Sequence, residues 1–185
     1  MRPRSPGSAA RRRGRGPARS GDEEAPVATG DAYTAGLILL GRRELSEAQV
    51  RTRLASRGFD ETQIDEAIVR LKAIRALDDL RVAKAAARLE SAVRLRGRRR
   101  TLQKVRALGV ADEDARAAVA EVFAEVDEEA LLEQALTRRL RGASVAGLDR
   151  AGVGRVAAAL VRQGFALDRI LARLRRKGAP DTEVD

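Results

Sequence analysis

One spacing of apolar residues around a glycine occurs three times in this chain, at Gly58, Gly109 and Gly164. In each copy an apolar residue stands four positions before the glycine and another directly after it, and two more stand six and ten positions after it. Apolar residues four apart share one face of a helix. Glycine is the preferred residue just beyond a helix end, because it adopts a positive φ without steric cost. Each copy therefore predicts a helix, a glycine-capped turn and a second helix.

The residues beside each glycine fit a Schellman cap, in which two apolar side chains meet across the turn. The predicted pairs are Leu54 with Phe59, Val105 with Val110, and Leu160 with Phe165. Successive glycines are 51 and 55 residues apart (109 − 58 and 164 − 109), which leaves room for a third helix in each repeat. We therefore predict an all-α chain of three tandem three-helix units, with Gly58, Gly109 and Gly164 as structural turns.

The composition agrees with thin helical cores and excludes several kinds of chemistry. Charged residues make up 35% of the 185 residues and aromatic residues only 2%, so neighbouring units are expected to cover one another's apolar faces, as in helical repeats. The chain has no Cys and no His, which removes thiol nucleophiles, histidine bases and nearly all zinc sites. No apolar run approaches the ~18 residues of a membrane span. We predict a cytoplasmic protein that is no enzyme and needs no metal or cofactor.

Changes in composition and helix-capping residues divide the chain into five segments. Residues 1–30 are rich in Arg, Pro, Gly and Ser and predict a disordered basic tail, and residues 179–185 predict a short acidic tail. Capping boxes that begin at Ser46 and Asp60 open two helices of the first unit. The three predicted units span residues 31–75, 76–126 and 127–178.

Helical periodicity also predicts which faces are buried. In the first helix we expect Leu37 and Leu40 to point inward. A long helix is predicted to begin at Asp78 or Asp79. Its predicted apolar stripe consists of Val82, Ala86, Leu89 and Val93. The two adjacent aspartates could instead serve catalysis or metal binding, but helix capping accounts for them without a further partner.

The net charge of +10 favours a polyanionic partner, either nucleic acid or an assembly that contains it. A solvated Arg-rich surface is the alternative interpretation. Seven cations and no acid stand between residues 94 and 106, across a predicted helix–turn–helix junction. The candidate contact residues for nucleic acid, or for an assembly that contains it, are Arg94, Arg96, Arg98, Arg99, Arg100, Lys104 and Arg106. A solvated turn is the alternative for this stretch.

Two features argue against sequence-specific reading of nucleic acid. Phe59 and Phe165 are expected in the caps, so few aromatic side chains remain for base stacking. The helices after the glycines begin with acidic residues such as Asp60 and Asp112, which would repel DNA from a helix-turn-helix recognition helix.

Short motifs stand in all three units: Arg43-Glu44-Leu45-Ser46, Arg53-Leu54, Gly58-Phe59, Leu77-Asp78-Asp79, Leu102 with Gly109-Val110, and Gly164-Phe165 with Ile170. Taken in order and spacing, these motifs resemble those of the bacterial regulatory protein RecX family. They span about residues 33–177. Arg75-Ala76 stands where the family commonly has Gly, and Val82-Ala83 where it has an aromatic-Ala pair, so the chain resembles a divergent member.

The resemblance implies an elongated, curved array that acts as a monomer and lodges in the groove of the RecA–DNA filament. It implies a negative regulator that restrains ATP hydrolysis and strand exchange, with roles in DNA repair, recombination and the SOS response. The implied partners are the RecA filament and single-stranded DNA, within the filament or weakly alone, and no membrane. Two alternatives remain: a helical-repeat nucleic-acid-binding protein that uses the central Arg-rich patch without RecA, and a helical scaffold for an acidic protein partner.

Overall fold

The computed structural model describes residues 30–178. The tails predicted at residues 1–30 and 179–185 lie outside these described residues, apart from Gly30. Within the described range every regular element is helical, which confirms the all-α prediction. The helices are α1 (Ala32–Arg42), α2 (Glu47–Ala55), α3 (Glu61–Ala73), α4 (Asp79–Arg88), the π-helical turn η1 (Leu89–Val93), α5 (Arg98–Arg106), α6 (Asp112–Ala124), α7 (Glu128–Leu140), α8 (Arg150–Arg162) and α9 (Leu167–Gly178).

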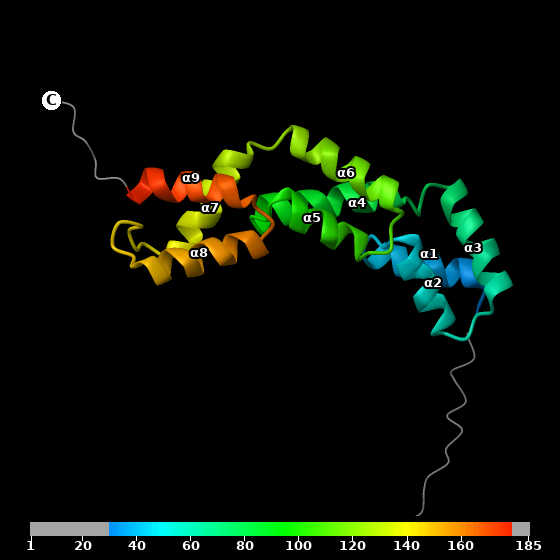
Figure 1. Cartoon of the computed structure of the whole chain (residues 1–185). Helices are drawn as coiled ribbons and strands as arrows, with labels where there is room; N and C mark the ends of the chain where they lie inside the picture. Colours follow the sequence, from blue (N-terminus) through cyan, green and yellow to red (C-terminus); the bar gives the residue numbers. More distant parts are fainter. Residues whose placement is uncertain (1–29, 179–185) are drawn as a thin grey trace, which may run out of the picture.

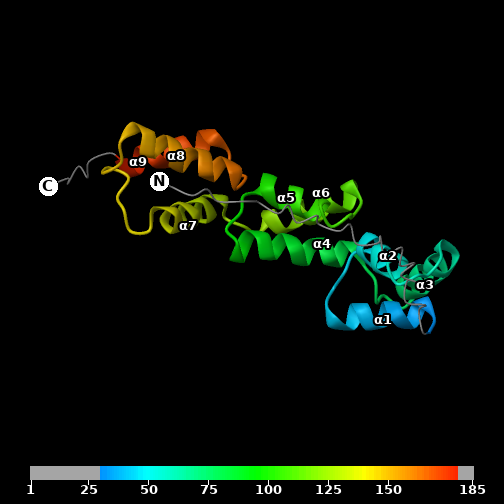
Figure 2. The same ribbon diagram turned by 90° about the horizontal axis from the view of Figure 1, so that it is seen from below.

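The helices form three groups that follow one another in an elongated, curved array (Figures 1 and 2). We call them unit 1 (α1–α3), unit 2 (α4–α6 with η1) and unit 3 (α7–α9). The unit boundaries placed at residues 75/76 and 126/127 stay predictions, and both fall in the connections that follow α3 and α6.

Local polar chemistry sets the helix starts. The Ser46 hydroxyl accepts a hydrogen bond from the Gln49 N–H at 3.3 Å, and the Gln49 side chain accepts one from the Ser46 N–H. Asp60 and Gln63 repeat this reciprocal pair at the start of α3. Both capping boxes are therefore confirmed, and each satisfies backbone donors that the first helical turn leaves without partners.

The three repeated glycines all lie in the left-handed region, as a glycine-capped turn requires, with φ of 87° at Gly58, 80° at Gly109 and 96° at Gly164. In the first and third turns both Schellman hydrogen bonds are present. The Phe59 N–H donates to the Leu54 carbonyl at 3.3 Å, and the Phe165 N–H donates to the corresponding carbonyl of α8 at 3.2 Å.

Two predictions about buried faces hold only in part. In α1 the buried residues are Ala32, Gly36 and Leu39. Leu40 is half-buried and packs against the apolar core, as predicted, whereas Leu37 is 36% exposed and the prediction for it is wrong. The reason is close packing: a Cβ on Gly36 would lie 2.7 Å from the Leu71 side chain of α3, so α1 turns its small-residue face toward α3.

The stripe predicted along the long helix also fails at its second half. Leu89 is 46% and Val93 63% exposed, while Glu90 and Ser91 are buried. The helix passes into the π-helical turn η1 at Leu89. A π-helical turn holds more residues than an α-helical one, so the residues that follow rotate to a different face.

The apolar core divides unequally among the units. Unit 1 has its own cluster, which includes Leu54, Ile68 and Leu71. A second cluster runs continuously through units 2 and 3 and includes Val105 and Leu160. Units 2 and 3 therefore stabilise each other through shared burial, as expected for helical repeats with thin cores.

The turn at Gly109 packs against the start of α2 in the preceding unit. A Cβ on Gly109 would lie 2.5 Å from the Ala48 Cβ, so only glycine permits this approach. The Ser46 hydroxyl donates a hydrogen bond to the Leu108 carbonyl, and Asp79 Oδ1 accepts one from the Glu47 N–H at 2.7 Å. Asp79 therefore joins units 1 and 2, and its neighbour Asp78 caps α4.

The turn at Gly164 repeats this arrangement one unit later, against the start of α5. The Gly97 N–H donates to the Gln163 carbonyl at 3.0 Å. A Cβ on Gly164 would lie 2.4 Å from the Arg100 backbone nitrogen. The glycines of the second and third repeats thus serve both a positive φ and a close contact between units.

Alanine substitutions should separate the cost of a side chain at a positive φ from the cost of a collision between units. Gly142 also has a positive φ, of 91°, but its Cβ would meet nothing within 4 Å, so Gly142→Ala should lower the free energy of unfolding by about 1–2 kcal/mol. Gly109→Ala and Gly164→Ala should cost a further ~1–3 kcal/mol, because the new methyl group collides with the adjacent unit. Urea unfolding followed by circular dichroism measures the difference, and equal decreases at the three positions would contradict the close packing between units.

Asp79 should show how its charge affects the joint between units 1 and 2. Burial raises the pKa of the Asp79 carboxyl, although the Glu47 N–H opposes this shift. A raised folded-state pKa means that the stability contributed by the protonated acid is present at low pH and is lost as the pH rises through the raised pKa. We expect Asp79→Asn, which keeps an acceptor for Glu47, to be at least as stable as the wild type at neutral pH and less pH-dependent. Asp79→Ala should cost about 1–2 kcal/mol, and the interpretation fails if thermal melts show both variants equally destabilised.

Candidate polyanion-binding groove

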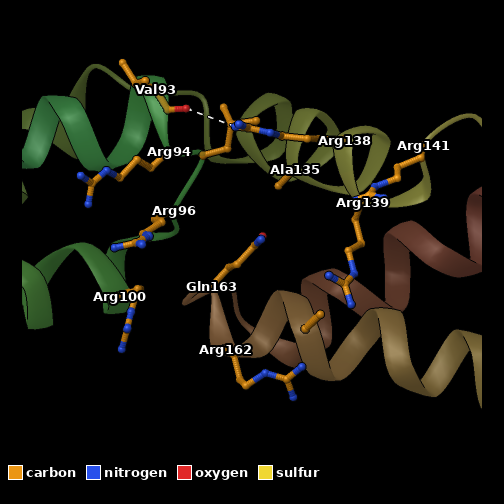
Figure 3. Close-up of a pocket in the computed structure, with 12 residues that line it drawn as sticks. Val93, Arg94, Arg96, Arg100, Ala135, Arg138, Arg139, Arg141, Arg162 and Gln163 are labelled. Carbon is orange, nitrogen blue, oxygen red and sulfur yellow. Dashed lines mark hydrogen bonds between the residues drawn. The ribbon is translucent and has the colours of Figure 1, made fainter.

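A groove lies between units 2 and 3, where the η1–α5 connection faces α7 and α8 (Figure 3). Its volume is about 600 Å³. Seven of the twelve residues that line it are arginines. They are Arg94, Arg96, Arg100, Arg138, Arg139, Arg141 and Arg162. A second hollow of about 340 Å³ shares Arg100 and Arg162 with this groove and adds Arg99, so the arginine lining continues along the joint. We call the two hollows together the arginine groove.

The arginines come from both sides of the groove. Figure 3 shows Arg96 and Arg100 on the side of unit 2, with Arg139 and Arg162 across from them. The Arg138 guanidinium reaches toward η1 and donates a hydrogen bond to the Val93 carbonyl at 3.3 Å. The joint at Gly164 holds α5 and the end of α8 together, and therefore holds the two sides of the groove at a fixed separation.

The seven predicted contact residues fall into two groups, those that form ion pairs with a carboxylate and those that do not. Arg94 and Arg96 both pair with Glu90, Arg98 pairs with Glu128 at 3.2 Å, and Arg106 pairs with Asp112 at 2.5 Å. The remaining three predicted residues have no carboxylate of residues 30–178 within 4.0 Å. They are Arg99, Arg100 and Lys104. The acid-free stretch of sequence is therefore partly neutralised by acids on either side of it.

The groove contains only part of the predicted set. Arg94, Arg96, Arg99 and Arg100 line it, whereas Arg98, Lys104 and Arg106 do not. Arg98 lies with its guanidinium 5.3 Å from the centre of the Phe123 ring, and this interaction together with the Glu128 pair gives it a structural role.

Four groove arginines were not among the predicted contact residues. They are Arg138, Arg139, Arg141 and Arg162. Three of them stand at the end of α7, where cations also suit the helix dipole, so the sequence offered a simpler explanation. The repeat could have pointed to Arg162 as a residue beside the joint between units. Arg162 stands two residues before Gly164, the position that Ala107 has before Gly109 in the preceding repeat.

The joint between units 1 and 2 provides an internal comparison. It carries a hollow in the equivalent place, lined by residues that include Ala48, Gln49 and Ala107. Ala48 and Gln49 stand 51 residues before Arg99 and Arg100, and Ala107 stands 55 residues before Arg162. The repeat architecture therefore makes the hollow, but the cluster of arginines belongs to the joint between units 2 and 3, since Arg53 is the single arginine among the described residues that line the hollow between units 1 and 2.

Comparison with known proteins assigns the chain to a family. A family model described as "RecX, first three-helix domain" matches residues 32–71. The regulatory protein RecX of Syntrophotalea carbinolica is 32% identical over 136 residues, which cover 74% of this chain and 89% of that protein. This chain belongs to the RecX family. The regulatory protein RecX of Treponema pallidum is 34% identical over 122 residues, covering 65% of this chain and 74% of the relative.

Solved RecX structures share the fold. The crystal structure of RecX from Lactobacillus salivarius superposes with a TM-score of 0.64 at 20% identity, over 78% of this chain and 95% of that one. A second crystal structure of regulatory protein RecX gives a TM-score of 0.65 at 21% identity, over 78% of this chain and 70% of that one. The tandem three-helix architecture is therefore that of the RecX family.

The groove of this RecX-family chain is suited to binding anions. Guanidinium groups present several N–H donors in a plane that matches phosphate oxygens, and they stay charged at all physiological pH values. Over the part of the chain that the structure describes, no cluster of three or more acidic side chains is placed to hold a metal ion. None of the described helices is long and apolar enough to span a membrane.

Charge removal inside and outside the groove should have different effects on binding. Arg99→Gln with Arg100→Gln removes two groove charges, while Lys104→Gln with Arg106→Gln removes two nearby charges that do not line it. We expect the first pair to weaken binding to single-stranded DNA and to reduce the slope of log K against log salt by about 0.7 for each phosphate that the variant no longer neutralises. Fluorescence anisotropy over a salt series measures both quantities. Equal weakening in the two double variants would show that net charge, rather than the groove, determines affinity.

Proposed function

We propose that this RecX-family chain is a non-enzymatic regulator of the RecA recombinase. It binds in the groove of the RecA–DNA filament in the cytoplasm, as a monomer, and restrains ATP hydrolysis and strand exchange. This role connects it to DNA repair, recombination and the SOS response, and it requires no cofactor. Its relatives carry the name regulatory protein RecX, and that name supports the assignment to regulation.

The arginine groove supports this function most directly. Five of the seven arginines in the main groove have no carboxylate of the described residues within 4.0 Å, and the other two share Glu90. So many like charges in one hollow favour a ligand with several negative charges. A nucleoprotein filament presents phosphates in a regular row, and an elongated array of units is suited to follow a helical groove (Figure 1).

The position of the arginines adds a direction to the proposed contact. They cluster at the joint between units 2 and 3, while the equivalent hollow at the other joint has Ala48, Gln49 and Ala107 in the places of Arg99, Arg100 and Arg162, and one arginine, Arg53. In the proposed complex the strand of the filament therefore lies at units 2 and 3, and unit 1 contacts another part of the assembly.

The second candidate function is binding of nucleic acid without RecA. The unpaired groove arginines favour it, because phosphate contacts alone give affinity for any single strand. The two functions differ in one respect: a RecA regulator binds the assembled filament more tightly than the bare strand, and a general binder does not.

Steady-state ATP hydrolysis by RecA on single-stranded DNA tests the proposed function. We expect the rate to fall as the protein is added, because the bound chain restrains the filament. Arg139→Gln with Arg162→Gln should need a higher concentration for the same effect, whereas Lys104→Gln with Arg106→Gln should act like the wild type. An unchanged rate, together with no association with the filament in co-sedimentation, would overturn the proposal. Inhibition accompanied by equally tight binding to bare DNA would favour the second function.

A further inference from the structure

In the turn η1, apolar residues lie at the surface, while a charged residue and a polar residue are buried. Leu89 and Val93, which α-helical spacing places inward, are 46% and 63% exposed, while Glu90 is 5% and Ser91 1% exposed. Stability alone favours the opposite arrangement, because buried carboxylates are costly and exposed apolar side chains gain nothing. π-helical turns occur frequently at functional sites. A role in binding accounts for a turn that buries a carboxylate and exposes apolar side chains.

Glu90 is the centre of this arrangement. Its Oε1 accepts a hydrogen bond from Arg94 Nη1 at 2.7 Å, and its Oε2 accepts one from Arg96 Nη1. The carbonyl of Glu90 also accepts a hydrogen bond from the Arg96 N–H at 2.9 Å. Between the two arginines, Leu95 has a φ of 52°, a left-handed conformation that L-residues other than glycine adopt at a cost.

The surrounding contacts place this cluster at the rim of the groove. Arg94, Leu95 and Arg96 line the unit 2 side, and Arg138 of α7 donates to the Val93 carbonyl within η1. The hydrogen bonds of Arg94 and Arg96 to the Glu90 carboxylate use Nη1 of each side chain, so Nη2 and Nε of each guanidinium remain available to donate to a ligand.

We propose that Glu90 is a positioning residue of the arginine groove: it fixes the guanidinium groups of Arg94 and Arg96 at the rim, opposite Arg139 and Arg162. The ligand is a chain of phosphates, namely the phosphodiester backbone of a single strand, and this inference rests on the anion-binding groove of the proposed function. Two long side chains held in advance lose less conformational freedom when the phosphates bind.

The alternative is that Glu90 only neutralises charge, and the two roles predict opposite signs. Removing its charge raises the net charge of the groove by one, which by electrostatics alone strengthens binding to phosphates. Removing a positioning carboxylate frees Arg94 and Arg96, which weakens binding in spite of the added charge.

Glu90→Gln in the full chain separates the two roles, and Glu128→Gln is the matched control. Glu128 pairs with Arg98 outside the groove, so the control makes the same change in net charge and leaves the rim intact. The measurement is equilibrium binding to a labelled oligodeoxythymidine strand by fluorescence anisotropy. We expect Glu90→Gln to weaken binding roughly tenfold, the effect of losing one charge-assisted hydrogen bond, and Glu128→Gln to bind as tightly as the wild type or more tightly. A Glu90→Gln variant that binds as tightly as the wild type, or more tightly, overturns the inference.

A double-mutant cycle guards against a general loss of folding. If Glu90 acts through its two partners, Glu90→Gln has no further effect on affinity once Arg94→Gln and Arg96→Gln are present. A loss of affinity that persists in that background overturns the inference, as does a wild-type chain that binds no single strand at low salt.

The outcome is distinguishable from that of the proposed function. A chain that leaves RecA hydrolysis unchanged, but whose strand binding weakens with Glu90→Gln, would refute regulation of RecA and support the positioning role. A chain that inhibits RecA, but whose affinity for the strand is unchanged by Glu90→Gln, would support regulation of RecA and refute the positioning role.

Discussion

The close backbone contacts at Gly109 and Gly164 determine how the units stack. Each turn approaches the start of a helix in the preceding unit so closely that a methyl group would lie 2.4–2.5 Å from its neighbour. A collision at such a distance moves whole helices, because packed interiors have few voids to absorb it. The separation of Arg100 and Arg162, on opposite sides of the arginine groove, therefore depends on a residue that has no side chain.

Much of the fold could be predicted because it follows from local chemistry. Ser46 and Asp60 carry the side chains that satisfy free N–H groups at a helix start, and Gly58 permits a conformation that other residues resist. Each of these effects acts within a few residues. The buried face of α1 does not, because it depends on how closely Leu71, thirty-five residues beyond Gly36, approaches that glycine.

Part of the groove could be predicted from the sequence, because sequence patterns show local effects and do not show how distant units pack. Arg96 and Arg100 stand close together in the sequence, so their shared charge was apparent, but Arg162 joins them only through the packing of unit 3. The partners that neutralise Arg98 and Arg106, including Glu128, also lie outside the stretch that looked free of acids. A count of charges along the sequence cannot separate arginines that line a groove from arginines held in ion pairs.

The two joints of the array differ in what holds them. Units 1 and 2 have separate apolar cores and meet through polar contacts such as Asp79 with the Glu47 amide and Arg81 with Glu44. Units 2 and 3 share one core, and the arginines lie over that joint. A binding site needs its groups held within a fraction of an ångström of their working positions, which a continuous apolar core supports better than exposed ion pairs, each worth little on its own. The location of the arginines at the better-packed joint is therefore what a site for regularly spaced phosphates requires.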